Sequence, residues 1–114
     1  MNVEKTKAQM RKGVLEYCVL AIISGSEVYA SDIIDKLKEA EMIVVEGTLY
    51  PLLTRLKNDN LLSYRWEESK SGPPRKYYSI TEQGRELLTE LHEGWKVMVE
   101  SVNKLADNTY LTNQ

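Results

Sequence analysis

Apolar residues recur along this chain with two different periods, and the two periods predict different secondary structure. Steps of three and four residues predict amphipathic helices, whereas strict alternation predicts strands with one packed face. We therefore expect a mostly α protein with a small β-hairpin, which is an α+β fold. The predicted helices cover residues 5–24, 32–40, 46–59 and 82–106, and the predicted hairpin strands cover residues 62–67 and 75–80.

Residues at the ends of the predicted helices support these limits. Gly25 follows the first helix, and Ser31 or a neighbouring residue is placed to cap the second. Asn60 follows the third helix, where a left-handed backbone is expected and Asn tolerates one. Thr81 is a suitable N-cap for the last helix. Pro51 falls near the first turn of the third helix, where it need not interrupt the hydrogen-bond ladder.

Two apolar groups outside the helices are also expected to be packed. Ile43, Val44 and Val45 follow one another in the connection between the second and third helices, so this connection should lie against the core. Tyr64 and Trp66 alternate along the first strand. We interpret them as aromatics that pack on the sheet rather than as groups that stack on bases.

The last predicted helix carries a continuous apolar seam. At about 1.5 Å per residue this helix is roughly 40 Å long, so it extends beyond the small body from which it emerges. An apolar stripe exposed in this way marks an association surface. We expect a homodimer, although the helix could instead fold back on its own domain. The predicted dimer-interface residues are Leu88, Leu91, Trp95, Met98, Val102 and Leu105.

The third predicted helix is followed directly by a hairpin with a basic segment and a loop rich in Ser, Gly and Pro. This order is the layout of a winged helix-turn-helix. We assign residues 1–80 to such a domain and residues 81–114 to a dimerisation helix with a polar tail. The second half of the first helix is apolar on all sides, so we expect it to contribute to the dimer interface as well.

Charge is unevenly distributed along the chain. The net charge is −2, yet cations outnumber acids in residues 1–12 and 64–80, and a phosphate responds to the local field more than to the total. No apolar run reaches the roughly 20 residues of a membrane span. Cys18 is the single cysteine and allows no disulfide framework, so we expect a buried structural thiol. These features predict a cytoplasmic protein without a membrane partner.

The sequence contains few residues in patterns typical of a catalytic site. His92 is the only histidine, and no Cys, Asp or Glu cluster around it has the spacing of metal ligands. No glycine-rich loop suited to cradling phosphates occurs either. We therefore expect no enzyme activity, no metal and no cofactor.

Short motifs occur in a fixed order: Val28-Tyr29, GTLYPLLTRL at 47–56, Asn60-Leu-Leu, GPPRKYY at 72–78, ITEQG at 80–84 and Trp95. In this combination the chain resembles the PadR family of bacterial transcriptional regulators. The long helix after the hairpin is similar to the short-chain subgroup, in which the C-terminal part is one dimerising helix. Ala30 and Asn60 stand where the family often has glycine.

The resemblance implies a dimeric repressor of transcription that binds an inverted-repeat operator in double-stranded DNA. Its third helix would enter the major groove, and its wings would touch the flanking backbone. Side chains with hydroxyl groups or positive charge suit both tasks, and glycine permits close approach. The predicted DNA-binding residues are Tyr29, Ser31, Thr48, Tyr50, Pro51, Thr54, Arg55, Lys70, Gly72, Arg75 and Lys76.

Trp95 leaves two interpretations open. Some short-chain PadR-like proteins resemble this chain in placing a tryptophan near the two-fold axis, where it stacks on flat hydrophobic drugs. Such an effector would change DNA affinity through the spacing of the recognition helices. Alternatively, Trp95 only fills the dimer seam.

Two other functions stay open from sequence. The winged helix could dock a protein instead of DNA, or the dimer could bind drugs without any regulatory role. The cations clustered on the wing and Arg55 favour DNA, because a protein-docking wing has no need of clustered positive charge.

Overall fold

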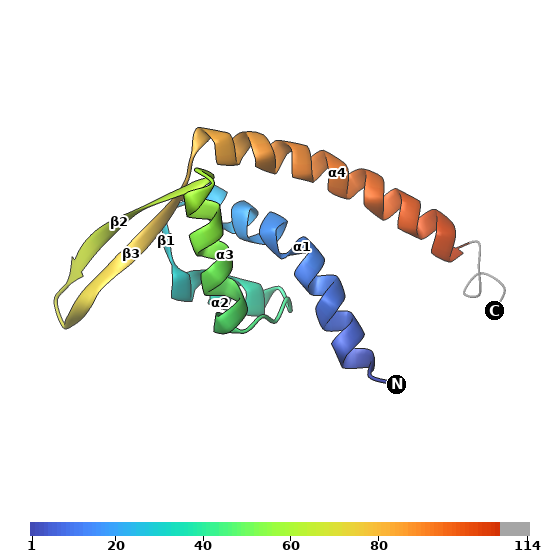
Figure 1. Ribbon diagram of the computed structural model, residues 1–114, viewed down its shortest axis with the longest axis horizontal. Helices are drawn as coiled ribbons and strands as arrows, with labels where there is room; N and C mark the ends of the chain where they lie inside the picture. The colour runs from blue at the N-terminus through green and yellow to red at the C-terminus, as the bar shows by residue number, and fades with distance from the viewer. Residues whose placement is uncertain (108–114) are drawn as a thin grey trace.

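The computed structural model describes residues 1–107, and the tail of residues 108–114, which is polar in the sequence, lies outside the described residues. A long C-terminal helix leaves a small body made of helices and a sheet (Figure 1). This confirms the mostly helical α+β fold predicted from the sequence. The elements are α1 (Val3–Gly25), β1 (Val28–Tyr29), α2 (Ala30–Glu39), α3 (Glu46–Asn58), β2 (Leu62–Ser69), β3 (Gly72–Ile80) and α4 (Glu82–Asp107).

The sheet has three antiparallel strands in the order β1-β3-β2. The prediction of a two-stranded hairpin was therefore incomplete. Strand β1 is only two residues long, which is too short for an alternating pattern to appear, and Tyr29 pairs with Tyr77. Strand β3 begins at Gly72, before its predicted start. The ladder is irregular between Glu67 and Ser69, so the prolines that follow Gly72 lie at an interrupted part of it.

The core lies between the second half of α1, the inner faces of α2 and α3, and the base of the sheet. Its largest fully buried side chains are Leu20, Ile23, Ile33, Leu37, Leu49, Leu53, Leu56, Leu62 and Val19. Cys18, predicted to be buried, is partly buried against this cluster, and burial raises the pKa of its thiol.

The connection between α2 and α3 only partly follows the sequence expectation. Val44 packs against the core, but Ile43 and Val45 are 64 % and 67 % exposed, so the prediction that all three are packed was wrong. The physical reason is alternation. The chain turns at Glu41, where φ is 62°, and then continues without helical structure, so that neighbouring side chains point in opposite directions.

The predicted end signals of α3 and α4 are confirmed. Asn60 has the left-handed φ of 62°. The Thr81 hydroxyl donates to the carbonyl of Asn60 at 2.6 Å and accepts from the backbone N–H of Gly84 at 3.0 Å. Because Thr81 caps α4 while holding the end of α3, this contact sets the direction in which α4 leaves the body. The cap of α2 is Tyr29, whose backbone N–H donates to Asp32.

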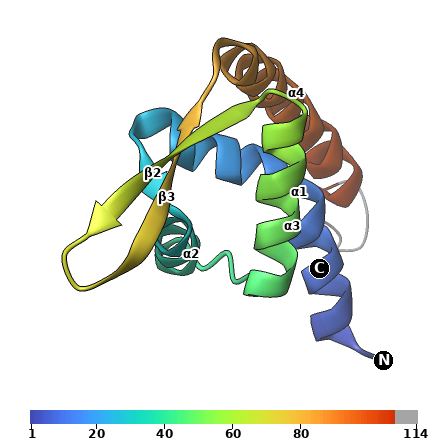
Figure 2. The same ribbon diagram turned by 60° about the vertical axis from the view of Figure 1, so that its left-hand side comes forward.

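Helix α4 starts on the body and extends past it beside α1 (Figures 1 and 2). Leu88 and Leu91 pack against the core, whereas Trp95 is 39 % exposed and Leu105 is 71 % exposed. The exposure predicted for the outer part of the seam is therefore confirmed. The Tyr17 hydroxyl and His92 Nδ1, 2.6 Å apart, join the two helices. Within residues 1–107, no helix combines the length and apolar character that crossing a membrane requires.

Candidate nucleic-acid interface

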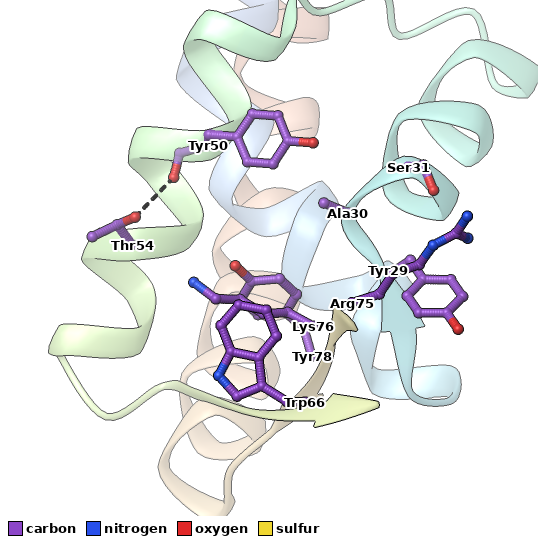
Figure 3. Close-up of a pocket in the computed structure, with 9 residues that line it drawn as sticks. All are labelled: Tyr29, Ala30, Ser31, Tyr50, Thr54, Trp66, Arg75, Lys76 and Tyr78. Atoms are coloured by element: carbon purple, nitrogen blue, oxygen red, sulfur yellow. Dashed lines mark hydrogen bonds between the residues drawn. The ribbon is translucent and has the colours of Figure 1, made fainter. Parts of the chain in front are cut away.

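A surface depression of about 340 Å³ lies between α3, the N-terminal end of α2 and the wing, by which we mean β2, β3 and their connecting turn (Figure 3). Hydroxyl groups, cations and aromatic rings from these elements converge in it. The residues that line it are Tyr29, Ala30, Ser31, Tyr50, Thr54, Trp66, Arg75, Lys76 and Tyr78. Six of these nine were predicted from the sequence as DNA-binding residues.

Helix α3 supplies Tyr50 and Thr54 to the depression. The two residues are one helical turn apart, so they share a face, and the Thr54 hydroxyl donates to the Tyr50 carbonyl at 3.2 Å. Burial of the leucines on the opposite face, Leu49, Leu53 and Leu56, sets the rotation of the helix. Pro51 is exposed in the N-terminal part of α3. This part of α3 therefore presents polar groups outward without losing its apolar anchor.

Thr48 and Arg55 lie on a different flank of α3, outside the depression. Thr48 faces a smaller hollow beside α1. The Arg55 guanidinium lies 3.4 Å from a carboxylate oxygen of Glu16 on α1 and 3.6 Å from one of Asp59. The structure thus divides the predicted α3 residues into two groups. The division follows from the roughly 100° turn between successive helical residues, which separates Arg55 from Thr54.

The wing is attached to the start of α2 by a column of alternating rings and guanidinium groups. The rings of Tyr29 and Tyr77 stack with centroids 3.9 Å apart. Arg75 lies 5.1 Å from the Tyr29 ring and Arg65 lies 4.8 Å from the Tyr77 ring. A side-chain hydrogen bond with Tyr29 is the main cause that raises the pKa of Tyr77 to about 12. The column holds Arg75 at the edge of the depression.

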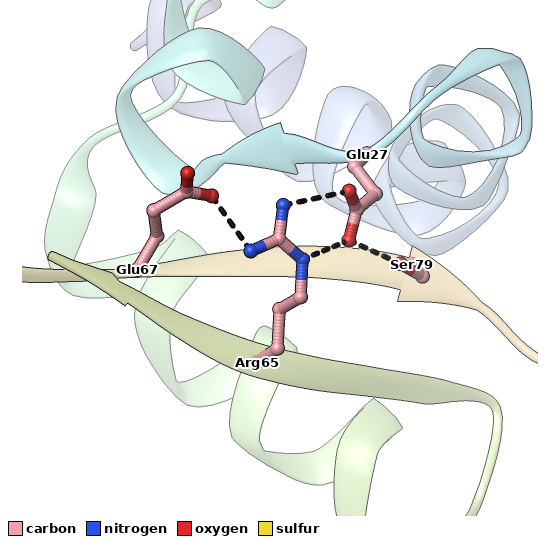
Figure 4. Close-up of polar contacts among 4 residues, drawn as sticks. All are labelled: Glu27, Arg65, Glu67 and Ser79. Carbon is pink, nitrogen blue, oxygen red and sulfur yellow. Dashed lines mark hydrogen bonds and ion pairs between the residues drawn. The ribbon is translucent and has the colours of Figure 1, made fainter.

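Arg65 is held on the far side of this column by carboxylates (Figure 4). Its guanidinium donates to both oxygens of Glu27, at 2.8 and 3.0 Å, and lies 2.6 Å from Glu67; the Ser79 hydroxyl also donates to Glu27, at 3.3 Å. The hydrogen bond from Arg65 holds the pKa of the Glu27 carboxyl below its usual value. The contacts of Arg65 with Glu27 therefore join β2 to the turn before β1.

The other predicted wing residues are Lys70 and Gly72, which lie at the exposed tip and do not line the depression. Sequence reasoning missed Trp66. As predicted it packs on the sheet, edge to face with Tyr64 at 6.2 Å between centroids, but it is 60 % exposed, whereas Tyr78 on the same strand pair is 6 % exposed. Its exposure follows from the strand register, because Trp66 pairs with Lys76 near the open end of the ladder.

A second, apolar groove lies between α1 and the outer half of α4. Its volume is about 670 Å³, and the Trp95 ring lies 6.3 Å from the ring of Tyr17 at its inner end. The groove is lined by Met10, Arg11, Gly13, Val14, Met42, Trp95, Met98, Val99, Val102 and Asn103. No cluster of His, Cys, Asp and Glu suited to a metal ion occurs within residues 1–107.

Comparison with known proteins identifies the family. Residues 19–90 match the model of the transcriptional regulator PadR-like family. A PadR-like transcription factor from Bacteroides fragilis is 61 % identical, with a TM-score of 0.74, and the match covers 89 % of this chain and 98 % of that one. A PadR-like transcriptional regulator from Bacillus cereus is 42 % identical, with a TM-score of 0.77, over 89 % of this chain and 99 % of that one.

The fold is also similar to that of Bacillus subtilis PadR, whose structure was solved in complex with operator DNA. The match has 23 % identity and a TM-score of 0.64, and it covers 68 % of this chain and 46 % of that one. The matched family model takes in α2, α3, the wing and the start of α4, and so contains every residue of the depression. The chain therefore belongs to the PadR-like family of transcriptional regulators, and it is a DNA-binding regulator of transcription rather than an enzyme.

Proposed function

We propose that this protein is a dimeric repressor whose two protomers bind an inverted-repeat operator through α3 and the wing. The observation that carries this proposal is the depression that α2, α3 and the wing share, in which hydroxyl groups and cations converge. The major groove of B-DNA admits a helix, and side chains near the N-terminal end of that helix reach the base edges. Tyr50, Pro51 and Thr54 are assigned to this contact.

The remaining residues of the interface are assigned to the DNA backbone. Tyr29 and Ser31 lie at the N-terminal end of α2, and their hydroxyl groups can donate to phosphate at a helix end whose dipole favours negative charge. The wing adds its cations and its exposed glycine, namely Lys70, Gly72, Arg75 and Lys76. The Bacillus subtilis PadR complex supports this arrangement, because it shows that a protein with this fold can hold operator DNA.

Arg55 and Thr48 are assigned to the edge of the interface. Arg55 is half exposed, and its carboxylate partners, Glu16 and Asp59, are also accessible to solvent. Surface ion pairs of this kind contribute about 0–1 kcal/mol. A DNA phosphate can therefore displace Glu16 or Asp59 at small cost, and Arg55 then acts as a backbone contact rather than as a base reader.

Residues 81–107 are proposed to form the dimerisation helix of a unit whose DNA-binding part is residues 1–80. Support comes from the apolar side chains that α4 leaves exposed beyond the body, namely Trp95, Met98, Val102 and Leu105. A second copy of α4, together with α1, would cover them. To bind successive major grooves on one side of the duplex, the two copies of α3 in the dimer would need to lie about 34 Å apart.

A hydrophobic or aromatic small molecule is proposed as the effector. The supporting observation is the apolar groove of about 670 Å³ beside Trp95, a size within the roughly 300–1,000 Å³ range of small-molecule sites. The alternative is that the side chains of the partner protomer fill this groove completely. A ligand wedged between α1 and α4 would alter the separation of the two α3 helices and hence the affinity for the operator.

The test is selection of bound sequences from a pool of random duplexes, followed by titration of the selected duplex at several salt concentrations. We expect an inverted repeat and a log–log salt slope of about −0.9 per phosphate contact. Sedimentation at micromolar concentration should report a dimer. If no duplex is enriched, or if binding is insensitive to salt, the protein-docking alternative is favoured and the proposal is rejected.

A further inference from the structure

An aromatic–lysine cluster occupies the face of the wing that looks toward α3. It consists of Tyr64, Trp66, Lys57 and Lys76. The Lys76 ammonium lies 4.5 Å from the centroid of the Tyr64 ring and 5.3 Å from that of Trp66. The Lys57 ammonium, which comes from α3, lies 5.6 Å from the Tyr64 ring. The two rings meet edge to face with centroids 6.2 Å apart.

The contacts of Trp66 with Tyr64 and Lys76 leave most of the indole uncovered. The indole is 60 % exposed although it lines the depression. Within residues 1–107, it belongs neither to the buried core nor to the partly buried side chains packed against that core. A broad apolar surface with positive charge beside it is therefore accessible to a partner.

The backbone of double-stranded DNA matches this combination of groups. Phosphates repeat along each strand, and the deoxyribose rings between them present less polar surfaces. The cluster offers ammonium groups beside a flat ring, and the cation–π contacts hold Lys76 in place before DNA arrives, so that less side-chain entropy is lost on binding. Tyr50 and Thr54 lie across the depression from Trp66, so a strand seated there would contact both walls (Figure 3).

We propose that Trp66 is a DNA-contacting residue whose indole packs against the deoxyribose of the strand flanking α3, while Lys76 and Lys57 bind the adjoining phosphates. This inference rests on the proposed function and adds to it an apolar contact on the wing. The wing then holds the backbone by two different forces, charge attraction and burial of the indole.

Salt dependence separates these two forces. Loss of a phosphate contact lowers the log–log salt slope by about 0.9, whereas loss of an apolar contact releases no counterion and leaves the slope unchanged. Trp66→Ala should therefore weaken binding to the selected operator about tenfold at every salt concentration, the order of one aromatic contact. Trp66→Phe should restore most of the affinity. Lys76→Ala should reduce the slope, and Lys96→Ala, which removes a cation of α4 paired with Glu93, should not.

Tryptophan emission gives an independent measurement, because the chain has only two tryptophans, Trp66 and Trp95. Saturating operator duplex should change the emission of the wild-type dimer as the exposed indole of Trp66 becomes covered. In Trp66→Phe, in which only Trp95 remains, most of this change should disappear although the duplex is still bound.

The two proposals fail in different ways. Absence of duplex binding by the wild-type protein would reject the proposed function and this inference with it. If the wild-type protein binds its operator, equal affinity of Trp66→Ala at all salt concentrations would overturn the role of Trp66 alone. A full emission change retained by Trp66→Phe would overturn it as well, and this variant does not depend on the folding of Trp66→Ala.

Discussion

Gly84 lies in the first turn of α4, against Leu61 and Ile80 at the base of the wing. Replacing it with alanine should destabilise the protein. A methyl group at this position would lie 2.2 Å from the carbonyl oxygen of Leu61 and 2.7 Å from Cγ1 of Ile80. The oxygen would have to move by about 0.8 Å to reach the 3.0 Å that such contacts need. It cannot move freely, because it accepts a hydrogen bond of 3.1 Å from the backbone N–H of Thr81.

The size of the effect follows from two opposing contributions. Forcing a methyl group into a packed site costs typically 1–3 kcal/mol, about the range we assign to this contact. Alanine recovers at most about 1 kcal/mol through its higher helix propensity. Because the clash involves backbone that already caps α4, we place the cost near the upper end of this range, about 3 kcal/mol, and expect a net loss of about 2 kcal/mol. With an unfolding entropy of about 2.1 cal/mol/K per residue, a chain of 114 residues should show a thermal midpoint lower by roughly 8 °C.

The assay is thermal unfolding followed by circular dichroism at one fixed protomer concentration, since the midpoint of a dimer depends on concentration. Gly25→Ala is the matched control, because a methyl group at Gly25 in α1 meets nothing within 4 Å. We expect its midpoint to equal or slightly exceed that of the wild type. A Gly84→Ala midpoint as high as that of Gly25→Ala would show that the close contact with Leu61 does not determine how α4 is seated.

Three further predictions concern the operator contact, the dimer and the acid stability. Lys76→Ala should weaken operator binding at low salt and lower the salt slope by about 0.9, as measured by fluorescence anisotropy; an unchanged slope would contradict a phosphate contact. Replacing Trp95 and Leu105 together with glutamine should give a monomer in sedimentation, and a persistent dimer would place the interface elsewhere. The hydrogen bond from Arg65 lowers the pKa of Glu27 from its ordinary 4.5. The ion pair therefore stabilises the fold fully above pH 4.5, and this stabilisation is lost as the pH falls through the lowered pKa. Glu27→Gln should therefore melt lower than the wild type at pH 7 and approach it at pH 3, and a difference that does not shrink in acid would refute this.

Local signals in the sequence were sufficient to predict most of the helices and the residues at which they end. Asn60 takes the left-handed conformation that its position predicts, and Thr81 caps α4. The seam of α4 is exposed from Trp95 onward, as its length implies. These features depend on interactions within about one helical turn, or on the contrast between one long helix and a short chain. Interactions within one helical turn and the length of a helix can both be inferred from the residue order alone.

Other features required the tertiary structure. Strand β1 exists because Tyr29 pairs with Tyr77, which lies far along the chain. Arg55 and Thr54 are neighbours in sequence, but α1 brings Glu16 to Arg55, and the wing completes the depression on the side of Thr54. Trp66 is exposed because no other element covers that end of the wing. The periodicity of a segment specifies which of its faces is apolar, whereas the group that meets each polar position depends on how distant segments pack together.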